Sequence, residues 1–483
     1  MRIENMIIPR PAEIIEQNGV VCHLGKINWI EGAGVCKSGV KCINDALIAI
    51  GANPLPSHLS KMNLGTRQRI SFNVNAENLA PEEYVLNISN ESIVIEGGDA
   101  AGVFYGAQSL VQMLAVCSEL GGHDRYLPVC VIKDRPRFKY RGIMIDSARH
   151  FQKPEILLKL IDEMAKYKLN VLHWHLVDRQ SWRLPLACAP ELLKNVPRSR
   201  AYVFGAYTKE DIQRVVEYAE NRYIQVIPEI EMPGHSAAVF YTHPELACPV
   251  SPTPYEDDFW EFCIGNDEVE IFLTKILQEC VELFPNSKYI HIGGDEASDA
   301  HWRNCPRCQK KMSSLGFKEP RELEQYFMAR MEQVVNNLGR QAISWGIPHG
   351  DGENFTGRMV IQNWLRNDIN SYLNGSHQVI NSFHVNNYFD YPAGDSEPVV
   401  DYQRRNYEFD PAAGVTPEKI SLVLGGEGCI WSEQIPQWRV LPRAIPRMRA
   451  LAEILWSHPE HKDFDNFLLR ERLLTGSGLY RYC

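Results

Sequence analysis

The 483-residue sequence lacks the features by which several classes of protein are identified. No apolar run approaches the ~18 residues that a transmembrane helix needs, so we expect no membrane span. Acidic residues outnumber basic ones, 60 to 50, and no basic stripe is present, so nucleic acid is not an expected partner. Neither a Walker loop nor a GxGxxG stretch after an apolar run occurs, which argues against the common nucleotide-binding motifs.

The 13 cysteines do not have the spacing of a disulfide scaffold. They are scattered, and several lie within apolar segments, as Cys263, Cys280 and Cys429 do. We therefore expect mostly free, buried thiols. Cys305 and Cys308 form a lone CPRC. A zinc site usually needs a second cysteine or histidine pair at a matching spacing, and none is evident, so local structure or a disulfide is favoured over metal binding or redox chemistry.

Residues 1–134 combine short strands with a helix, which is typical of a small α+β domain. RISFNVN and YVLNISNESIVIEGG alternate polar and apolar residues, as strands with one exposed face do. GVFYGAQSLVQMLAV is predicted to form an amphipathic helix. DRPRF is a charged connection broken by proline, and we expect the boundary there, between domains of residues 1–134 and 135–483.

In the second part, short apolar runs alternate with helical segments such as PEILLKLIDEMAKYK and KEDIQRVVEYAENR. This alternation predicts a parallel sheet, and eight runs favour a closed (β/α)8 TIM barrel over an open sheet. The expected class is therefore α/β, a barrel preceded by the small α+β domain. The eight candidate strands are YRGIMID (140–146), NVLHWHLVD (170–178), IQVIPEIE (224–231), YIHIGGDE (289–296), AISWG (342–346), MVIQNW (359–364), QVINSF (378–383) and LVLGGEGCIW (422–431).

Polar and aromatic side chains gather where these runs end. The carboxyl ends of barrel strands converge on one mouth, where active sites lie. This mouth is rich in carboxylates and tryptophans. The carboxylates would repel an anion. A sugar suits the mouth, because the aromatic faces pack on its ring and the carboxylates accept hydrogen bonds from its hydroxyls. Carbohydrate hydrolysis is the favoured chemistry. The residues concerned are Asp146, Asp178, Glu231, Asp295, Glu296, Trp345, Trp364 and Trp431.

HIGGDE, residues 291–296, places Asp295 and Glu296 side by side. Adjacent residues on a strand point to opposite faces, whereas two carboxylates that flank one scissile bond face each other. A helix N-cap, made by Asp295 or Asp299, is the structural alternative.

A metal-dependent hydrolase is the alternative of a different class. HWH puts His173 and His175 on one face of a strand, where they could ligate a divalent ion with Asp295. The pair falls inside the candidate strand rather than at its end, and no second histidine cluster is evident. Core histidines are therefore favoured over metal ligands.

Five motifs occur in order: DSARHF, NVLHWHLVDRQSWR, IPEIEMPGHS, HIGGDE and GGEGCIWSE. Together they resemble glycoside hydrolase family 20, the β-N-acetylhexosaminidases, over most of residues 135–483. The preceding segment, ending in GVFYGAQSL, is similar to the small domain of this family. The resemblance implies a retaining exo-β-N-acetylhexosaminidase that removes terminal β-linked N-acetylglucosamine, with N-acetylgalactosamine as an open alternative. It also implies that the 2-acetamido oxygen of the substrate attacks the anomeric carbon and forms an oxazolinium.

The resemblance implies a catalytic role for five residues. Glu296 is the acid above the leaving oxygen, and Asp295 is the carboxylate against the acetamido N–H. Because the two acids act at different substrate atoms, side chains that point in opposed directions suit these roles. The two glycines of HIGGDE let the end of the strand twist. We expect a raised pKa for Glu296 and an ionised Asp295. Asp178 and His235 orient and tune Glu296, although a plain loop histidine is an alternative for His235. Tyr388 hydrogen-bonds the acetamido oxygen.

Six further residues are implied in substrate binding. Arg149 holds sugar hydroxyls, with a salt bridge to Asp146 as the alternative. Asp390 faces the 6-hydroxyl and Glu433 the 4-hydroxyl region, with surface carboxylates as the alternative. Three tryptophans wall the acetamido pocket, with core packing as the alternative; they are Trp345, Trp364 and Trp431.

Arg179 departs from the family, which commonly has an acid at this place. Arg179 either faces away from the site or pairs with a catalytic acid and lowers its pKa.

The resemblance implies no metal and no organic cofactor. The expected partner is a glycan with a terminal N-acetylhexosamine, and a homodimer is one option for the oligomeric state. A narrower relative that releases a disaccharide such as lacto-N-biose is the alternative within the same chemistry. The first residues, MRIENMIIPR, show no secretory signal, so a secreted or periplasmic location requires that a signal was removed, and the cytoplasm is the other option.

Overall fold

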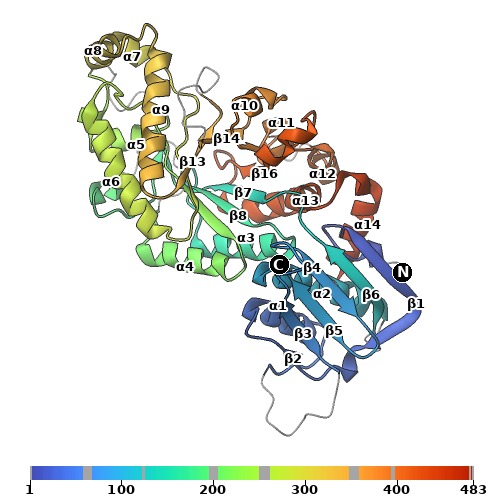
Figure 1. Ribbon diagram of the computed structural model, residues 1–483. Helices are drawn as coiled ribbons and strands as arrows, with labels where there is room; N and C mark the ends of the chain where they lie inside the picture. The colour runs from blue at the N-terminus through green and yellow to red at the C-terminus, as the bar shows by residue number, and fades with distance from the viewer. Residues whose placement is uncertain are drawn as a thin grey trace.

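The computed structural model describes residues 3–57, 68–121, 126–194, 205–249, 261–347, 358–392, 397–477 and 480. A small domain carries the first strands and helices, and a barrel with its surrounding helices forms the rest (Figure 1). The strands of the small domain are β1 (Glu13–His23), β2 (Ile30–Glu31), β3 (Ile70–Val74), β4 (Tyr84–Ile88), β5 (Ile93–Gly97) and β6 (Tyr126–Asp134). They form one sheet in the order β1-β6-β4-β5-β3-β2.

The helices have the following bounds: α1 (Lys37–Ala49), α2 (Ala100–Gly121), α3 (Pro154–Lys166), α4 (Lys209–Glu220), α5 (Ala237–Phe240), α6 (Asp267–Leu283), α7 (Ala300–Asn304), α8 (Pro306–Leu315), α9 (Pro320–Asn337), α10 (Asn370–Asn374), α11 (His384–Asn387), α12 (Val399–Glu408), α13 (Gln437–Trp456) and α14 (Phe464–Gly476).

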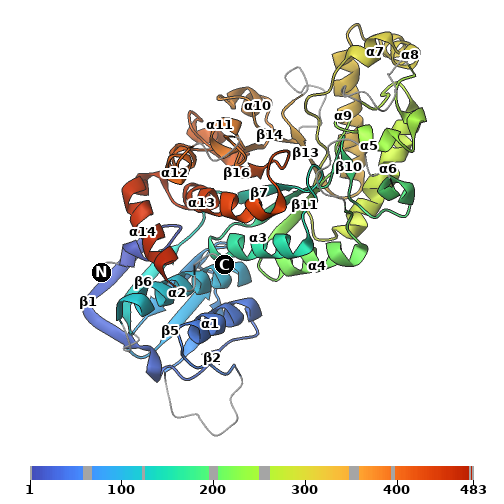
Figure 2. The same cartoon turned by 180° about the vertical axis from the view of Figure 1, so that it is seen from behind.

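The predicted helix is present as α2. Its residues 102–116 are buried on all sides, so the expectation that the helix is amphipathic is wrong. The helix contacts β4, β5 and β6 on one side and α14 on another, as the reverse view in Figure 2 shows. Gln112 donates to the backbone oxygen of Lys166 at the end of α3, 3.0 Å away. In the described part of the chain, Ala100–Glu119 alone is long and apolar enough to cross a membrane, and 83% of its most apolar window is buried inside the protein. An apolar run of this length therefore exists, contrary to the expectation from the sequence, and most of it is buried in the protein core.

All eight candidate barrel strands are present, and they close into a barrel in the order β11-β12-β13-β14-β15-β16-β7-β8. The predicted TIM barrel is therefore confirmed. The strands are β7 (Tyr140–Asp146), β8 (Val171–His175), β11 (Gln225–Glu229), β12 (Tyr289–His291), β13 (Gln341–Trp345), β14 (Val360–Asn363), β15 (Val379–Asn381) and β16 (Val423–Ile430), and β9 (Val177–Asp178) pairs with β10 (Ser181–Trp182) as a separate hairpin.

Several strands are shorter than the apolar runs that predicted them, and two of these differences bear on the site. Strand β8 ends at His175, so this histidine lies at the end of its strand and not inside it. Strand β12 ends at His291, so Asp295 and Glu296 lie in the following loop. The alternation rule of a strand therefore does not apply to the two acids.

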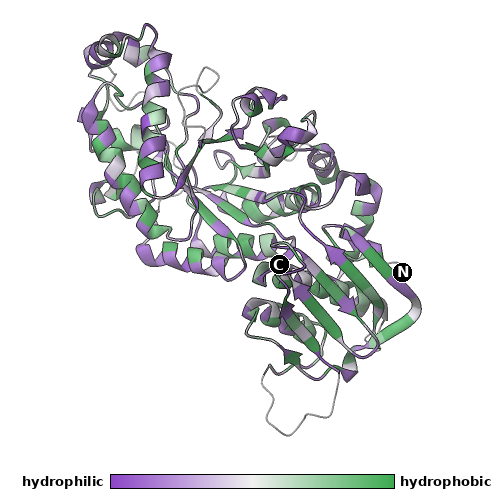
Figure 3. Ribbon diagram, in the orientation of Figure 1, coloured by the Kyte–Doolittle hydropathy of each residue, from purple (hydrophilic) through white to green (hydrophobic). Residues whose placement is uncertain are grey.

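The barrel interior changes in character from its base to its mouth. At the base, apolar side chains from seven strands pack together. Figure 3 shows hydrophobic strands inside helices whose outer faces are hydrophilic. Nearer the mouth, the inward positions carry buried histidines and glutamates, and the mouth itself carries tryptophans and acids. The apolar base residues are Tyr140, Val171, Ile227, Ile343, Val360, Ile380 and Leu424.

The small domain is tied to the base of the barrel, away from the mouth. The fully buried Arg141, at the start of β7, donates to both carboxylate oxygens of Glu82, at 2.8 and 3.1 Å. Lys168 pairs with Asp134 at 3.0 Å. These charges are buried and paired, as buried charges must be. Our division of the chain at residue 134 stays a proposal.

Candidate active site

The loop after β12 owes its shape to left-handed backbone conformations. The φ angles are +64° at Gly293, +107° at Gly294 and +51° at Glu296. A Cβ on Gly293 would stand 1.7 Å from a carboxylate oxygen of Glu231, so only glycine fits there. The chain turns sharply at these positions, and Asp295 and Glu296 both face one cavity.

That cavity, of about 370 Å³, brings together nine of the eleven residues predicted for the site. The two others lie beside it. Asp178 is buried behind His235 and Arg149, and Trp345 lines an adjoining cavity of about 420 Å³ that shares Asp295, Glu296 and Trp364 with the first. Tyr391 and Gln434 also line the cavity and were not predicted. The nine are Arg149, His235, Asp295, Glu296, Trp364, Tyr388, Asp390, Trp431 and Glu433.

A chain of charged groups runs from Glu296 into the protein. His235 Nε2 lies 3.5 Å from Glu296 Oε2 and 3.8 Å from Asp295 Oδ2. Its Nδ1 lies 3.3 Å from Asp178, which in turn lies 2.8 Å from Arg149 Nη2. His235 is therefore held between carboxylates on both ring nitrogens, as an orienting histidine is.

The aromatic residues form two walls. Trp364 and Tyr388 are parallel, with an interplanar angle of 6° and ring centroids 6.5 Å apart. Trp431 lies across from Tyr388 at 5.9 Å, and the Arg149 guanidinium stands 5.0 Å from the Trp431 ring. Trp345 is buried below, and its indole N–H donates to Glu229. Trp345 thus combines core packing with a place next to the cavity.

Arg149, Asp390 and Glu433 form the polar end of the cavity. Arg149 contacts Asp146 at 3.5 Å as well as Asp178, and Glu433 at 3.8 Å. The salt bridge considered as the alternative for Arg149 is thus present beside the position in the cavity. Arg443 of α13 donates to the backbone oxygen of Asp390 at 2.7 Å and so holds that loop.

Comparison with known proteins decides the family. The model of the glycosyl hydrolase family 20 catalytic domain matches residues 138–459, and that of domain 2 of the same family matches residues 4–135. The chain belongs to glycosyl hydrolase family 20. The predicted resemblance is thereby confirmed.

Individual members of family 20 resemble the whole chain. It is 33% identical to a beta-hexosaminidase of Porphyromonas gingivalis over 96% of this chain but spans only 62% of that protein's length. A GH20 exo beta-N-acetylglucosaminidase of Vibrio harveyi, solved with N-acetylglucosamine, superposes with a TM-score of 0.85 at 28% identity, over 99% of this chain and 78% of that one. A beta-N-acetylhexosaminidase of Bacteroides fragilis gives 0.81 at 28% identity, over 98% and 94%.

The pKa of Glu296 differs from the prediction made from the family 20 resemblance. His235, whose Nε2 lies 3.5 Å from Glu296, lowers the pKa of Glu296, and Arg149 and Arg179 add to this effect. Burial raises the pKa of Asp295 to about 6. The expectation of a raised pKa for Glu296 is therefore wrong. Asp295, with a pKa of about 6, is still mostly ionised at neutral pH, as expected. The physical reasons are the burial of the Asp295 side chain, which is 13% exposed, and the position of His235 beside the Glu296 side chain, which is 51% exposed.

Arg179 has part of the second effect considered for it. Its charge helps to lower the pKa of Glu296, but less than His235 does.

Beneath the family 20 site lies a buried layer of histidines and glutamates that sequence reasoning missed. His173 lies 3.1 Å from Glu229 and 2.9 Å from Glu427. His291 lies 2.8 Å from Glu229. Burial opposes the charge on His173, but Glu427 and Glu229 outweigh it and raise the pKa of His173 to about 9. The alternating inward positions HWH, PE and YIH on neighbouring strands were the available signal.

His173 and His175, the two histidines of the metal alternative, belong to this layer. His175 lies 3.2 Å from Asp146 and 3.3 Å from Glu231. In the described part of the chain, neither histidine lines the cavity. Both are buried histidines held by carboxylates.

Replacing Gly293 by alanine should destabilise the protein by ~2–4 kcal/mol, because strained backbone and overpacking against Glu231 add. Gly316→Ala is the matched control. Gly316 also has a positive φ, +76°, but a Cβ there meets no atom within 4 Å. Differential scanning calorimetry should show a much larger fall in unfolding temperature for Gly293→Ala. Equal falls would contradict the close approach to Glu231.

Proposed function

We propose that the protein is a retaining exo-β-N-acetylhexosaminidase that hydrolyses terminal β-linked N-acetylglucosamine from glycans with the assistance of the substrate's acetamido group. The observation that carries this proposal is the cluster of Asp295, Glu296 and His235 in the wall of an aromatic-lined cavity. One polar atom from each lies within 4.8 Å of the others. Inverting glycosidases separate their carboxyl groups by ~6.5–9.5 Å to hold a water, and the approach of both acids to one histidine favours a retaining reaction instead.

The sugar is proposed to bind with its acetamido group between the aromatic walls. Tyr388 donates its hydroxyl hydrogen to the acetamido oxygen, and Asp295 accepts from the acetamido N–H. Asp295 Oδ1 is buried and has no hydrogen-bond partner among the described residues, so it is free to accept. The same holds for Asp390 Oδ1, which would accept from a sugar hydroxyl. A buried acceptor without a partner costs free energy that such a ligand recovers.

The first chemical step breaks the glycosidic bond. The acetamido oxygen forms a bond to the anomeric carbon, the bond to the leaving oxygen breaks, and Glu296 gives its proton to that oxygen. Asp295 stabilises the positive charge that develops on the oxazolinium. In the second step, water gives a proton to Glu296, and the water oxygen attacks the anomeric carbon. The bond from that carbon to the acetamido oxygen breaks, which regenerates the acetamido group and retains the configuration.

The aglycone is proposed to occupy the adjoining cavity of about 420 Å³. Arg321, Arg366 and Tyr372 line it together with Glu296. An aglycone there would cover the exposed carboxyl of Glu296, and burial raises the pKa of a carboxyl group. Substrate binding would therefore shift the proton toward the group that must donate it.

The test is hydrolysis of p-nitrophenyl N-acetyl-β-glucosaminide and its galacto analogue, followed by NMR to identify the first anomer released. We expect turnover with release of the β-anomer. A thiazoline mimic of the cyclised intermediate should bind ~10²-fold tighter than N-acetylglucosamine or more, as transition-state analogues do.

Three outcomes would overturn the proposal. Release of the α-anomer would indicate an inverting reaction. Turnover that the thiazoline does not inhibit would indicate a mechanism without the acetamido group, such as a metal-dependent hydrolysis. Cleavage of p-nitrophenyl β-lacto-N-bioside, with both monosaccharide substrates inert, would indicate a disaccharide-releasing enzyme.

A further inference from the structure

Four cysteines far apart in the sequence meet at the end of the molecule that carries α7 and α8. Cys248 follows the 3-10 helix η4 (Pro244–Leu246), Cys263 follows a bridge residue, and Cys305 and Cys308 begin α8. All four are buried, with at most 3% of each exposed. The second pair that the spacing of CPRC did not reveal is thus supplied by Cys248 and Cys263.

The sulfur atoms have the arrangement of a metal site. The Sγ–Sγ distances are 3.6 Å for Cys263–Cys305, 3.8 Å for Cys263–Cys308 and 3.9 Å for Cys248–Cys308. All four sulfurs lie within 4.8 Å of one another. Zn–S bonds of ~2.3 Å at tetrahedral angles place sulfurs ~3.8 Å apart. A disulfide requires ~2.05 Å.

We propose that Cys248, Cys263, Cys305 and Cys308 bind one Zn²⁺ in a structural site. Four thiolates complete the tetrahedral coordination and leave no open position, so the ion would not activate water. Cys263 approaches two other sulfurs about equally, which favours a shared ion over separate pairs. Tetrahedral sulfur coordination in proteins selects zinc or iron, and zinc is the ion to which we commit.

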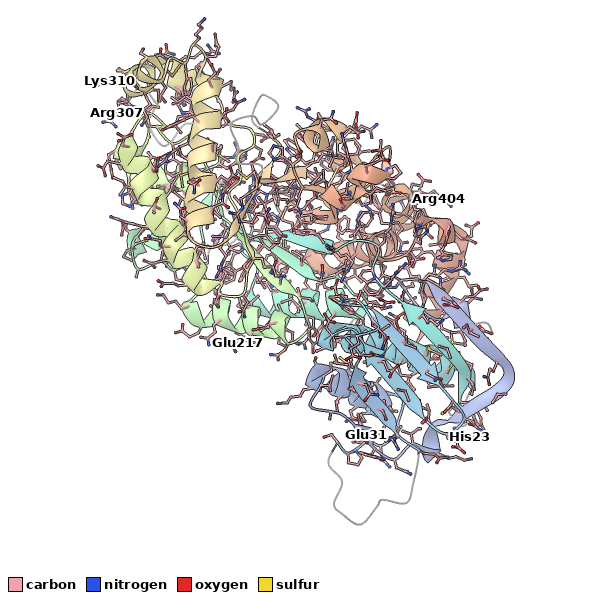
Figure 4. The ribbon with its side chains drawn as sticks, in the orientation of Figure 1. His23, Glu31, Glu217, Arg307, Lys310 and Arg404 are labelled. Atoms are coloured by element: carbon pink, nitrogen blue, oxygen red, sulfur yellow. The ribbon has the colours of Figure 1, made fainter. Side chains whose placement is uncertain are left out.

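The backbone around the cluster is built for close approach. A Cβ on Gly265 would stand 2.4 Å from the backbone nitrogen of Cys308, so glycine lets the two segments meet. Cys305 is the N-cap residue of the ten-residue helix α8, and a helix N-terminus favours thiolate over thiol. Arg307, between the two helix cysteines, and Lys310 lie at the same end of the molecule, far from His23 and Glu31 of the small domain (Figure 4).

The proposed site joins the two loops that carry the acid and its histidine. Phe262, next to Cys263, donates its N–H to the oxygen of Pro233, two residues before His235, at 2.9 Å. Glu261 accepts from the backbone N–H of Ser298, two residues after Glu296, at 2.8 Å. The zinc would therefore fix the relative position of these loops through the protein backbone. This role does not depend on which sugar the enzyme accepts.

The test is metal analysis of the purified full-length protein. We expect about one zinc per chain after gel filtration. Cys305→Ser and Cys308→Ser should each reduce the zinc content to near zero. Cys280→Ser is the matched control, because Cys280 is also fully buried but lies in α6 outside the cluster. That variant should keep its zinc.

A second measurement on the unaltered protein does not require that any variant fold. Titration with an organomercurial should release one zinc per chain, detected with a metallochromic dye, as four thiols react. Replacement by Co²⁺ should give the visible absorption of tetrahedral cobalt thiolate. A metal-free protein with four free thiols, two disulfides found by mass spectrometry, or iron in place of zinc would each overturn the inference. A zinc-containing protein without glycosidase activity would overturn only the proposed function.

Discussion

Replacing Glu296 by glutamine is expected to reduce kcat/KM for p-nitrophenyl N-acetyl-β-glucosaminide by ~10²–10⁴-fold, the usual contribution of a general acid. Glutamine keeps the size of the side chain but has no proton to give to the leaving oxygen. The loss should be largest for natural glycans, whose leaving alcohols are strongly basic. It should nearly vanish for a dinitrophenyl glycoside, whose leaving group needs no proton. Steady-state kinetics on this leaving-group series measures the effect.

The pH dependence of the same pair of proteins is a sharper measure. When Asp295 and Glu296 share one proton, that proton can be on either acid. The form protonated on Asp295 is the more stable, and the form protonated on Glu296 is the reactive one. Both forms disappear as pH rises through about 6, the pKa of Asp295. For the unaltered enzyme, kcat/KM should therefore reach its maximum on the acid side of that value and fall above it.

In Glu296→Gln with the dinitrophenyl glycoside, only an ionised Asp295 is required. The sign of the dependence should then reverse, so that kcat/KM rises with pH up to about 6 and stays high above it. Loss of the Glu296 charge should move this rise to lower pH, because that charge raises the pKa of Asp295. An equal loss for all leaving groups, or a falling limb above pH 6 that persists in the variant, would contradict the assignment of Glu296 as the acid.

Replacing Asp295 by asparagine is expected to reduce kcat by ~10²–10³-fold, the usual cost of removing one group that stabilises developing charge. The amide cannot balance the positive charge of the oxazolinium. Unlike the loss in Glu296→Gln, this loss should be the same for good and poor leaving groups. Affinity for the thiazoline, measured by calorimetry, should fall along with kcat.

Asp299→Asn is the matched control for this substitution. Asp299 lies four residues further along the same loop, where it pairs with Arg303 at 2.6 Å on the surface. A partly exposed ion pair of this kind contributes little, so kcat should stay close to that of the unaltered enzyme. A loss for Asp295→Asn that depends strongly on the leaving group would mean that Asp295, and not Glu296, gives the proton.

The fold could be predicted from local patterns because each barrel strand is a short apolar run bounded by helical segments. Strand β7 begins and ends at the predicted residues, Tyr140 and Asp146. The prediction for α2 was wrong because one sequence window does not show what covers the polar side of a helix. Here α14 and the end of α3 cover it.

The residues of the candidate site could also be predicted from the sequence, since every predicted side chain lies in or directly beside the two adjoining cavities. What the pattern could not give was orientation. Three positive φ angles after β12 turn the acids out of the strand, and they depend on the close approach of Gly293 to Glu231. The assignment of the individual roles remains a prediction for the experiments above.

The order of the pKa values required the tertiary structure, because burial and neighbouring charges act through space. Asp295 and Glu296 are adjacent and chemically similar, yet one is buried near Glu229 and the other is half exposed beside His235. Likewise, the approach of Cys263 to Cys305 joins residues 42 positions apart. Spacing along the chain carries no signal for such a pair.

The sequence by itself determined the barrel, the family 20 resemblance and the identities of the side chains at the mouth, because strand periodicity and ordered motifs are local properties of a chain. Only the tertiary structure decided which acid is the more protonated, which histidines belong to the buried layer beneath the mouth, and that four scattered thiols form one cluster. These properties depend on distances and burial, and chain folding sets both between residues that are remote in sequence.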